Sequence, residues 1–160
     1  MSKIYRHYGS SKYDPRCVNI VTRSRTIKPV GGLWACPLDS KNSWYNWCKQ
    51  EYWNTDSLNT YFDFKISDET KVLQINSFQD LVNMVRSFPG RSMDNLESSL
   101  IYHKANSDYH FTKFPDYVAI SKKYDAIEVS ITNCPDLFSW MYGWDVDSLV
   151  IWNEEMVIPI

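Results

Sequence analysis

The chain has few glycines, no long apolar run and no recognisable cofactor loop. Its 160 residues include only five glycines, and they form no phosphate-binding loop, dinucleotide fingerprint or Gly-x-Ser-x-Gly turn. No apolar stretch approaches the roughly 20 residues that a membrane-spanning helix needs, so we expect no membrane partner. Repeats and low-complexity segments are also missing. The length therefore predicts one domain over residues 1–160.

The chain also lacks a metal-binding pattern. Its four cysteines have no two-residue spacing, and its three histidines are not paired. This argues against a zinc site and, without a signal peptide, against a disulfide framework. We therefore predict no metal, a cytoplasmic location and free, mostly buried thiols, at Cys17, Cys36, Cys48 and Cys134.

Positive charge is missing from one end of the chain. Residues 1–28 hold seven Lys or Arg and one acid, whereas residues 124–160 hold seven acids and no Lys or Arg. The basic segment could meet phosphates while the acidic segment supplies carboxylates. Alternatively, the two segments pair with each other in the fold. The overall charge of −2 makes a nucleic-acid partner unlikely.

Aromatic side chains are abundant, at 16 % of the residues, and many follow the segment Lys-Pro-Val-Gly-Gly-Leu-Trp-Ala-Cys-Pro at 28–37. Adjacent glycines permit positive φ or a close approach of backbone to ligand. The run that begins at Trp44 and ends at Trp53 would provide an aromatic wall. Together these features predict a pocket for a flat ligand, although aromatic residues also fill ordinary cores.

Periodicity and turn residues predict mixed strands and short helices without a regular β-α-β rhythm. Strands are expected at 3–8, 32–36, 58–66, 71–75, 125–131, 147–152 and 156–160. Helices are expected at about 41–53, capped by Asp39 or Ser40, at 77–86, capped by Ser77, at 117–123, capped by Asp116, and at 135–142. We expect a long loop at 12–28 and make no assignment at 91–113, apart from a helical turn or two at 95–102. The fold class is α+β.

Three segments carry a resemblance to a known superfamily. His7-Tyr8-Gly9-Ser10 ends a strand, Trp34 follows a glycine pair on a second strand, and Asp147 opens a late strand with Ser-Leu-Val-Ile behind it. This order resembles the ADP-ribosyltransferases, which have a His-Gly-Thr/Ser strand, a Gly-hydrophobic-aromatic strand and an acid that opens a strand. The resemblance implies a mixed, mainly antiparallel split sheet flanked by short helices, with NAD as substrate.

The resemblance also implies a role for each matching residue. His7 or Tyr8, with Gly9 and Ser10, would hold the nicotinamide amide and nearby ribose, and Trp34 would stack on the ring. Asp147 would stabilise the positive charge that develops as the glycosidic bond breaks. Arg6, with Arg23 or Arg25, would bind the pyrophosphate. Gly32 and Trp44 complete the expected NAD site.

Several of these assignments have alternatives. The histidine of the superfamily could align with His7 or with Tyr8. Asp147 is one methylene shorter than the usual glutamate and could simply cap a turn, while Glu154 and Glu155 are competing acids. Arg6 could pair with an acid of the C-terminal third, and Trp34 could be core.

The chain also resembles a set of small bacterial and phage proteins that share the Ile-Tyr-Arg-His-Tyr-Gly-Ser start and a Gly-Trp-Asp-x-Asp-Ser segment. That resemblance implies a phage-encoded effector acting in the cytoplasm of a bacterial host. Two functions follow. The first is NAD-dependent modification of a macromolecule or small molecule. The second is a non-catalytic, anti-defence module that sequesters an adenine nucleotide or masks a host defence protein.

Overall fold

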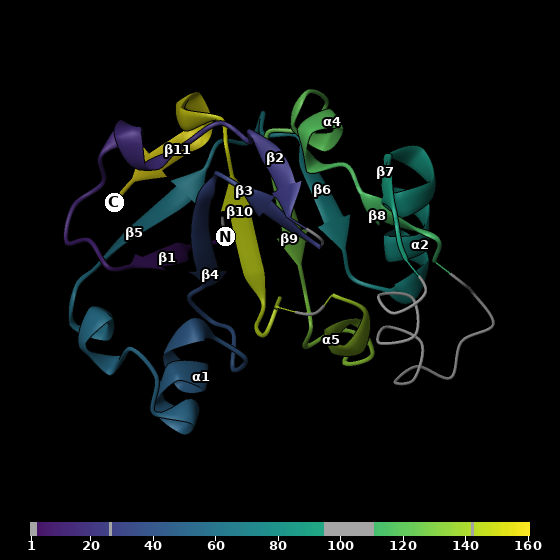
Figure 1. The fold of residues 1–160 in the computed structure, drawn as a ribbon. Helices are drawn as coiled ribbons and strands as arrows, with labels where there is room; N and C mark the ends of the chain where they lie inside the picture. Colours follow the sequence, from purple (N-terminus) through teal and green to yellow (C-terminus); the bar gives the residue numbers. More distant parts are fainter. Residues whose placement is uncertain (1–2, 26, 95–110, 142) are drawn as a thin grey trace.

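The computed structural model describes residues 3–25, 27–94, 111–141 and 143–160. Its centre is a seven-stranded sheet with the order β11-β5-β1-β4-β10-β9-β6 (Figure 1). The strands are β1 Tyr5–Tyr8, β4 Leu33–Pro37, β5 Tyr61–Ile66, β6 Val72–Ile75, β9 Ala126–Val129, β10 Ser148–Ile151 and β11 Val157–Pro159. Only the β6–β9 pair is parallel. The predicted α+β class with a mainly antiparallel sheet is therefore confirmed.

Shorter elements surround this sheet. Two strand pairs join β2 Arg23–Arg25 to β3 Lys28–Val30 and β7 Pro89–Ser92 to β8 Lys113–Pro115. The helices are α1 Trp44–Glu51, α2 Phe78–Ser87, α4 Tyr117–Ser121 and α5 Leu137–Trp140, and the 3-10 turns are η1 Pro15–Cys17, η2 Thr55–Asn59 and η3 Glu154–Met156. Figure 1 shows α1 beyond the end of β4, and α2 beside β6 on the opposite side of the molecule.

The central strand β4 joins the two parts of the sheet. Its first three residues pair with β10, and its last two, Cys36 and Pro37, pair with Arg6 and Tyr5 of β1. Beyond the Arg6–Cys36 pair the ladder between β1 and β4 stops, whereas β1 continues to pair with β5 as far as Tyr8. The sheet therefore opens beside the end of β1.

Alternation along the strands gives each face of the sheet its own core. One cluster contains Tyr5, Leu33, Phe62 and Leu149 among its members. The other lies under α2, α4 and α5 and includes Val150 of β10. Neighbouring residues of one strand therefore serve opposite faces, and this decides which side chains can share a cavity.

Local capping signals explain where the helices begin. Ser77 and Asp116 accept hydrogen bonds from the backbone N–H groups of Asp80 and Ala119, as expected of N-caps. Helix α1 begins later than predicted. Its cap is Ser43, whose side chain accepts from the Asn46 N–H.

One prediction about the basic segment needs correction. The expected loop at 12–28 contains η1, and its end pairs as the β2–β3 hairpin with Pro29 opposite Ser24. Glu128 of the acidic segment is 5 % exposed and accepts hydrogen bonds from Lys3, Tyr5 and Gln74. The Lys3–Glu128 pair thus links the basic segment to the acidic one, as the pairing alternative expected. The predicted turns at 95–102 lie outside the described residues.

The glycine pair has a different role from the one predicted. A Cβ on Gly31 would lie 2.2 Å from the Ile20 carbonyl oxygen, and a Cβ on Gly32 would lie 2.4 Å from Cγ1 of Val150. Both residues have positive φ, 117° and 78°. The pair therefore lets chain segments approach each other closely, rather than a ligand.

We predict that Gly31→Ala destabilises the fold by about 3 kcal/mol, because it combines left-handed strain with a backbone clash. Gly9→Ala is the matched control. Gly9 also has positive φ, 102°, but no atom lies within 4 Å of its added Cβ, so we expect a loss of about 1 kcal/mol. Urea unfolding of both variants measures the difference. Equal losses would contradict the role of close packing at Gly31.

Candidate functional site

The candidate site is a cavity of about 360 Å³ where the sheet opens between β1 and β4. Four parts of the chain form its walls: the end of β1, the middle of β4, the segment from α1 to η2, and the turn before β10. Lys28 contributes from β3. The lining residues are Arg6, His7, Tyr8, Gly9, Lys28, Trp34, Ala35, Cys36, Trp44, Trp53, Asn54, Ser57, Gly143, Asp145, Val146 and Ser148. Six of the nine site residues predicted from the sequence are among them.

Of the two candidates at the end of β1, both line the cavity, and Tyr8 does so among other tyrosines. Its ring lies 6.4 Å from that of Tyr45 and 6.1 Å from that of Tyr61. Burial raises the pKa of the phenol, and the neighbouring Arg6 partly offsets that rise. Tyr8 is therefore a neutral hydroxyl, able to donate and to accept a hydrogen bond.

His7 also lines the cavity, and its imidazole contacts the core as well. Its ring centroid is 5.1 Å from that of Phe62, which belongs to the cluster around Tyr5. Its Nδ1 lies 2.7 Å from the carbonyl oxygen of Trp34, so Nδ1 carries the proton and donates it to that bond. His7 thus connects β1 to β4 where their ladder has ended. Its position favours a positioning role over contact with a ligand.

Asp147 lies outside the cavity and is 6 % exposed. Its two carboxylate oxygens accept from the Ser40 hydroxyl at 2.7 Å and from the Thr132 N–H at 2.8 Å. Its own N–H donates to the carbonyl of Asn42 at 3.0 Å. These bonds fasten the chain before α1 and the turn after β9 to the start of β10. Asp147, the predicted catalytic acid, therefore holds two loops together through hydrogen bonds.

A different acid lines the cavity. Asp145 lies in the turn before β10, and Ser148, two residues beyond Val146, also faces the cavity. The Ser148 hydroxyl donates to the Val146 carbonyl at 2.9 Å. The competing acids Glu154 and Glu155 line a separate hollow beside Trp152. The segment Gly-Trp-Asp-x-Asp contains both acids, and the catalytic role was predicted for the second, Asp147, rather than for Asp145.

The Arg6 side chain already forms an ion pair. Its guanidinium makes two hydrogen bonds to Asp63, at 2.7 and 2.8 Å, and lies 3.7 Å from the ring centroid of Tyr61. The bond to Asp63 raises the pKa of the guanidinium. A pyrophosphate would have to compete with a bidentate ion pair. Arg6 does pair with an acid, as the alternative held, but the acid is on β5 rather than in the C-terminal third.

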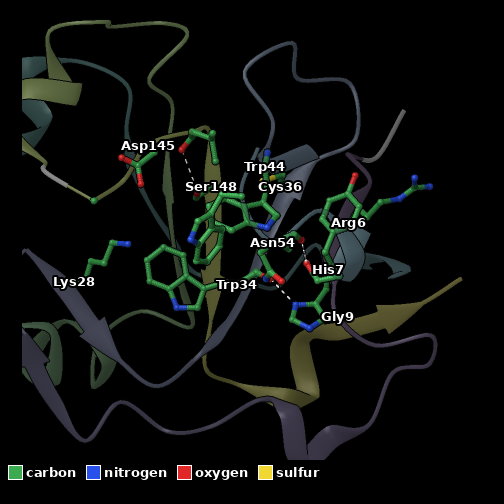
Figure 2. A pocket seen from close by; sticks show the side chains of 16 residues that line it. Arg6, His7, Gly9, Lys28, Trp34, Cys36, Trp44, Asn54, Asp145 and Ser148 are labelled. Atoms are coloured by element: carbon green, nitrogen blue, oxygen red, sulfur yellow. Dashed lines mark hydrogen bonds between the residues drawn. The ribbon is translucent and has the colours of Figure 1, made fainter. Parts of the chain in front are cut away.

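Trp34 is half-buried and contributes both to the cavity and to the core. Its ring centroid lies 4.8 Å from that of Trp144, and the Lys28 ammonium lies 5.2 Å from it. The Lys28 chain passes so close to Gly143 that a Cβ there would lie 2.7 Å from Cε. Trp34, Lys28 and Asp145 all line the cavity, and Figure 2 shows Lys28 and Asp145 on the side away from Gly9.

A cluster of three tryptophans adjoins the cavity. Trp44 stacks on Trp47 with ring centroids 5.0 Å apart and planes at 12°. Trp53 meets Trp44 edge to face, at 5.5 Å and 79°. Trp44 and Trp53 line the cavity, whereas Trp47 supports Trp44 from behind. The predicted aromatic wall is therefore present in part, because Tyr52 is 91 % exposed and does not line the cavity.

Ser10 and Gly32, the other two predicted site residues, do not line the cavity. The Ser10 hydroxyl donates to the Lys12 carbonyl at 2.8 Å, and Gly32 packs against Val150. Gly9 does line it, and its N–H donates to the Thr60 carbonyl at 2.8 Å. A ligand in the cavity can therefore come close to the backbone at Gly9.

Cys36 forms part of the cavity wall but is unsuited to nucleophilic chemistry. The thiol accepts a hydrogen bond from the Trp44 N–H at 3.3 Å, and burial raises its pKa to about 12. A thiol that stays protonated at neutral pH is a poor nucleophile. Its contact with the first turn of α1 instead helps to place Trp44.

Comparisons with protein-family models, with curated proteins and with solved structures gave no match. In the parts of the chain that the structure describes, no helix has the length and apolar character needed to cross a membrane. Those same parts contain no cluster of three or more His, Cys, Asp or Glu residues that could hold a metal ion. All four cysteines are described and carry free thiols, with Cys36 and Cys48 buried.

We predict that Asp147→Ala lowers the free energy of unfolding by about 3 kcal/mol, because it leaves the Thr132 N–H and the Ser40 hydroxyl without an acceptor. Asp145→Ala is the comparison, and since its carboxylate is partly exposed we expect a change within about 0.5 kcal/mol. Chemical denaturation of both variants tests this. If Asp147→Ala is as stable as Asp145→Ala, the hydrogen bonds of Asp147 are not required for stability.

We also predict that iodoacetamide at pH 8 modifies Cys36 far more slowly than the half-exposed Cys134. The thiolate is the reactive species, and burial raises the pKa of the Cys36 thiol to about 12. Peptide mass spectrometry over time measures both rates. In urea the two rates should converge. Equal rates in the native protein would contradict the burial of Cys36.

Proposed function

We propose that the protein is ADP-ribosyltransferase-like and binds NAD in the cavity between β1 and β4. The observation that carries this is the convergence of Tyr8, Gly9, Trp34 and Trp44 on one cavity, although they come from three separate segments of the chain. The resemblance to ADP-ribosyltransferases assigned these residues to the NAD site. A volume of about 360 Å³ lies at the lower end of the range of small-molecule sites, roughly 300–1,000 Å³.

The walls suit the parts of NAD. Tryptophan rings on two sides offer flat apolar surfaces for a heteroaromatic ring. Tyr8 supplies a neutral hydroxyl for an amide or a ribose, and Lys28 supplies positive charge for a phosphate. Arg6 is paired with Asp63, so a phosphate at its guanidinium would compete with that ion pair.

In this proposal Asp145, rather than Asp147, takes the role of the acid. The bond between the ribose C1′ and the nicotinamide nitrogen breaks, and its electron pair leaves with the nicotinamide, which becomes neutral. Positive charge develops on the ribose, and a fixed carboxylate nearby stabilises it. A nucleophile of the acceptor then bonds to C1′ and loses its proton to solvent. The acceptor is a macromolecule or a small molecule of the host cell.

A second function is supported by one specific observation. Asp147 lies outside the cavity with both carboxylate oxygens hydrogen-bonded, and the imidazole of His7, although His7 lines the cavity, is bonded to the Trp34 carbonyl, so two of the three residues predicted to be catalytic are held in structural contacts. A cavity with binding walls and an incomplete catalytic set would capture an adenine nucleotide without turnover. This corresponds to the alternative of a phage-encoded module that sequesters a nucleotide ligand.

We expect the purified protein to bind NAD in calorimetry and to release nicotinamide in the presence of an acceptor. Asp145→Asn should lower the rate of release by about 100-fold or more, the size expected when one charge-stabilising group is lost, with little change in NAD affinity. The matched control is Asp56→Asn. Asp56 is an exposed carboxylate on η2 that does not line the cavity, and its removal should leave release unchanged.

Three outcomes separate the candidates. Binding with release that depends on Asp145 supports the transferase. Tight binding with no release, across protein, nucleic-acid and small-molecule acceptors, supports nucleotide capture. If the folded protein binds neither NAD nor ADP-ribose, both proposed functions are contradicted.

A further inference from the structure

Lys28 reaches the cavity from outside the central sheet. It lies on β3, which pairs with β2 in a separate two-stranded sheet, and each of these strands has three residues. A two-stranded hairpin is by itself only marginally stable in water. The position of Lys28 in the cavity therefore depends on what holds this hairpin against the rest of the molecule.

Two buried side chains hold the turn of the hairpin through one backbone carbonyl. The carbonyl of Ile27, between β2 and β3, accepts a hydrogen bond from the Tyr117 hydroxyl at 2.6 Å and another from the Trp144 indole N–H at 2.7 Å. A carbonyl oxygen has two lone pairs, so both of its acceptor positions are used. The Tyr117 N–H also donates to the Ser24 hydroxyl at 2.7 Å, which fastens β2 to the start of α4.

Trp144 links this hairpin to the cavity. Its ring centroid lies 4.8 Å from that of Trp34, which lines the cavity, and 6.5 Å from that of Tyr117. Trp144 itself does not line the cavity, although its neighbours in the chain, Gly143 and Asp145, do. One side chain thus contacts both the turn of the hairpin and a residue of the cavity lining.

We propose that Tyr117 and Trp144 are positioning residues, which set the place of Lys28 in the cavity by holding the Ile27 carbonyl and thereby raise the affinity for NAD. This inference rests on the proposed function. Two donors on one buried carbonyl hold it firmly, because the loss of both leaves a buried acceptor unpaired. The hairpin is therefore fixed although its strands are short, and Lys28 loses little freedom when a ligand binds.

Hydrogen–deuterium exchange measures the holding of the hairpin without any ligand. Tyr117→Phe keeps the ring and removes one donor, so the amides of β2 and β3 should exchange about 3- to 10-fold faster, the range expected for one hydrogen bond. The double variant Tyr117→Phe/Trp144→Phe leaves the Ile27 carbonyl without either donor. Its increase should therefore exceed the product of the two single increases.

Trp152→Phe is the matched control for Trp144→Phe. Trp152 is also buried, and its indole N–H donates to a backbone carbonyl, that of Tyr124, at 2.6 Å. It lines a separate hollow rather than the cavity. Both changes shorten a buried side chain and remove one hydrogen bond, so both should lower the stability measured by urea unfolding. Only Trp144→Phe should speed exchange in the hairpin.

Calorimetry with NAD tests the positioning role. Tyr117→Phe and Trp144→Phe should each weaken NAD binding by about 3- to 10-fold, whereas Trp152→Phe should leave it unchanged. Lys28→Met removes the ammonium group that the hairpin carries and should weaken binding as well. In the Lys28→Met background, Tyr117→Phe should have little further effect, because Tyr117 acts through Lys28.

Three results would overturn the inference. The first is hairpin exchange in Tyr117→Phe and Trp144→Phe that is no faster than in Trp152→Phe. The second is faster exchange with unchanged NAD affinity, and the third is an effect of Tyr117→Phe that is equally large in the Lys28→Met background. If the parent protein binds no NAD, the proposed function is contradicted, and the exchange rates alone decide whether the two residues hold the hairpin. Circular dichroism confirms that each variant is folded.

Discussion

The end of the ladder between β1 and β4 is the constraint on which the candidate site depends. Arg6 and Cys36 are the last paired residues, and beyond them the two strands separate while each stays paired on its other side. The hydrogen bond from His7 Nδ1 to the Trp34 carbonyl spans the separation at 2.7 Å. It satisfies a carbonyl that the missing ladder would otherwise have paired. The cavity thus exists without leaving that polar group buried and unpaired.

Alternation then decides which side chains reach the cavity. Residues one apart on a strand face opposite sides, so Trp34 lines the cavity while its neighbour Leu33 packs in the cluster around Tyr5. The same rule separates Ser148, which lines the cavity, from Asp147, which is bonded to Ser40 and Thr132. If a strand is assigned one residue out of register, a residue that holds loops together is therefore mistaken for one that contacts a ligand.

This explains how much the sequence could predict. Local signals were sufficient for the caps at Ser77 and Asp116, for the central strands and for the α+β class, because each depends on a few adjacent residues. The gathering of the β1 end, Trp34 and Trp44 was also predicted. The face occupied by His7 or Asp147 was not, because it depends on where the β1–β4 ladder ends. That register is set by pairing between residues about 30 positions apart in the chain.

Charge could be located in the sequence, but its partners could not. The basic segment near the N-terminus does meet the acidic segment through Lys3 and Glu128, yet Arg6 pairs with Asp63 on β5. A paired guanidinium has limited capacity for a new anion, so the number of basic residues overstates the positive charge available to a ligand.

The cavity carries charge of both signs beside its aromatic side chains. Lys28 and Asp145 both line it, and Figure 2 shows them on the side away from Gly9. Trp44 and Trp53, which belong to the segment from α1 to η2, add apolar surface to the lining. Opposite charges on one side of a cavity partly offset each other, so a ligand gains from both only where its own positive and negative groups are placed to match. The cavity therefore selects a ligand by the order of its charges as well as by its flat rings.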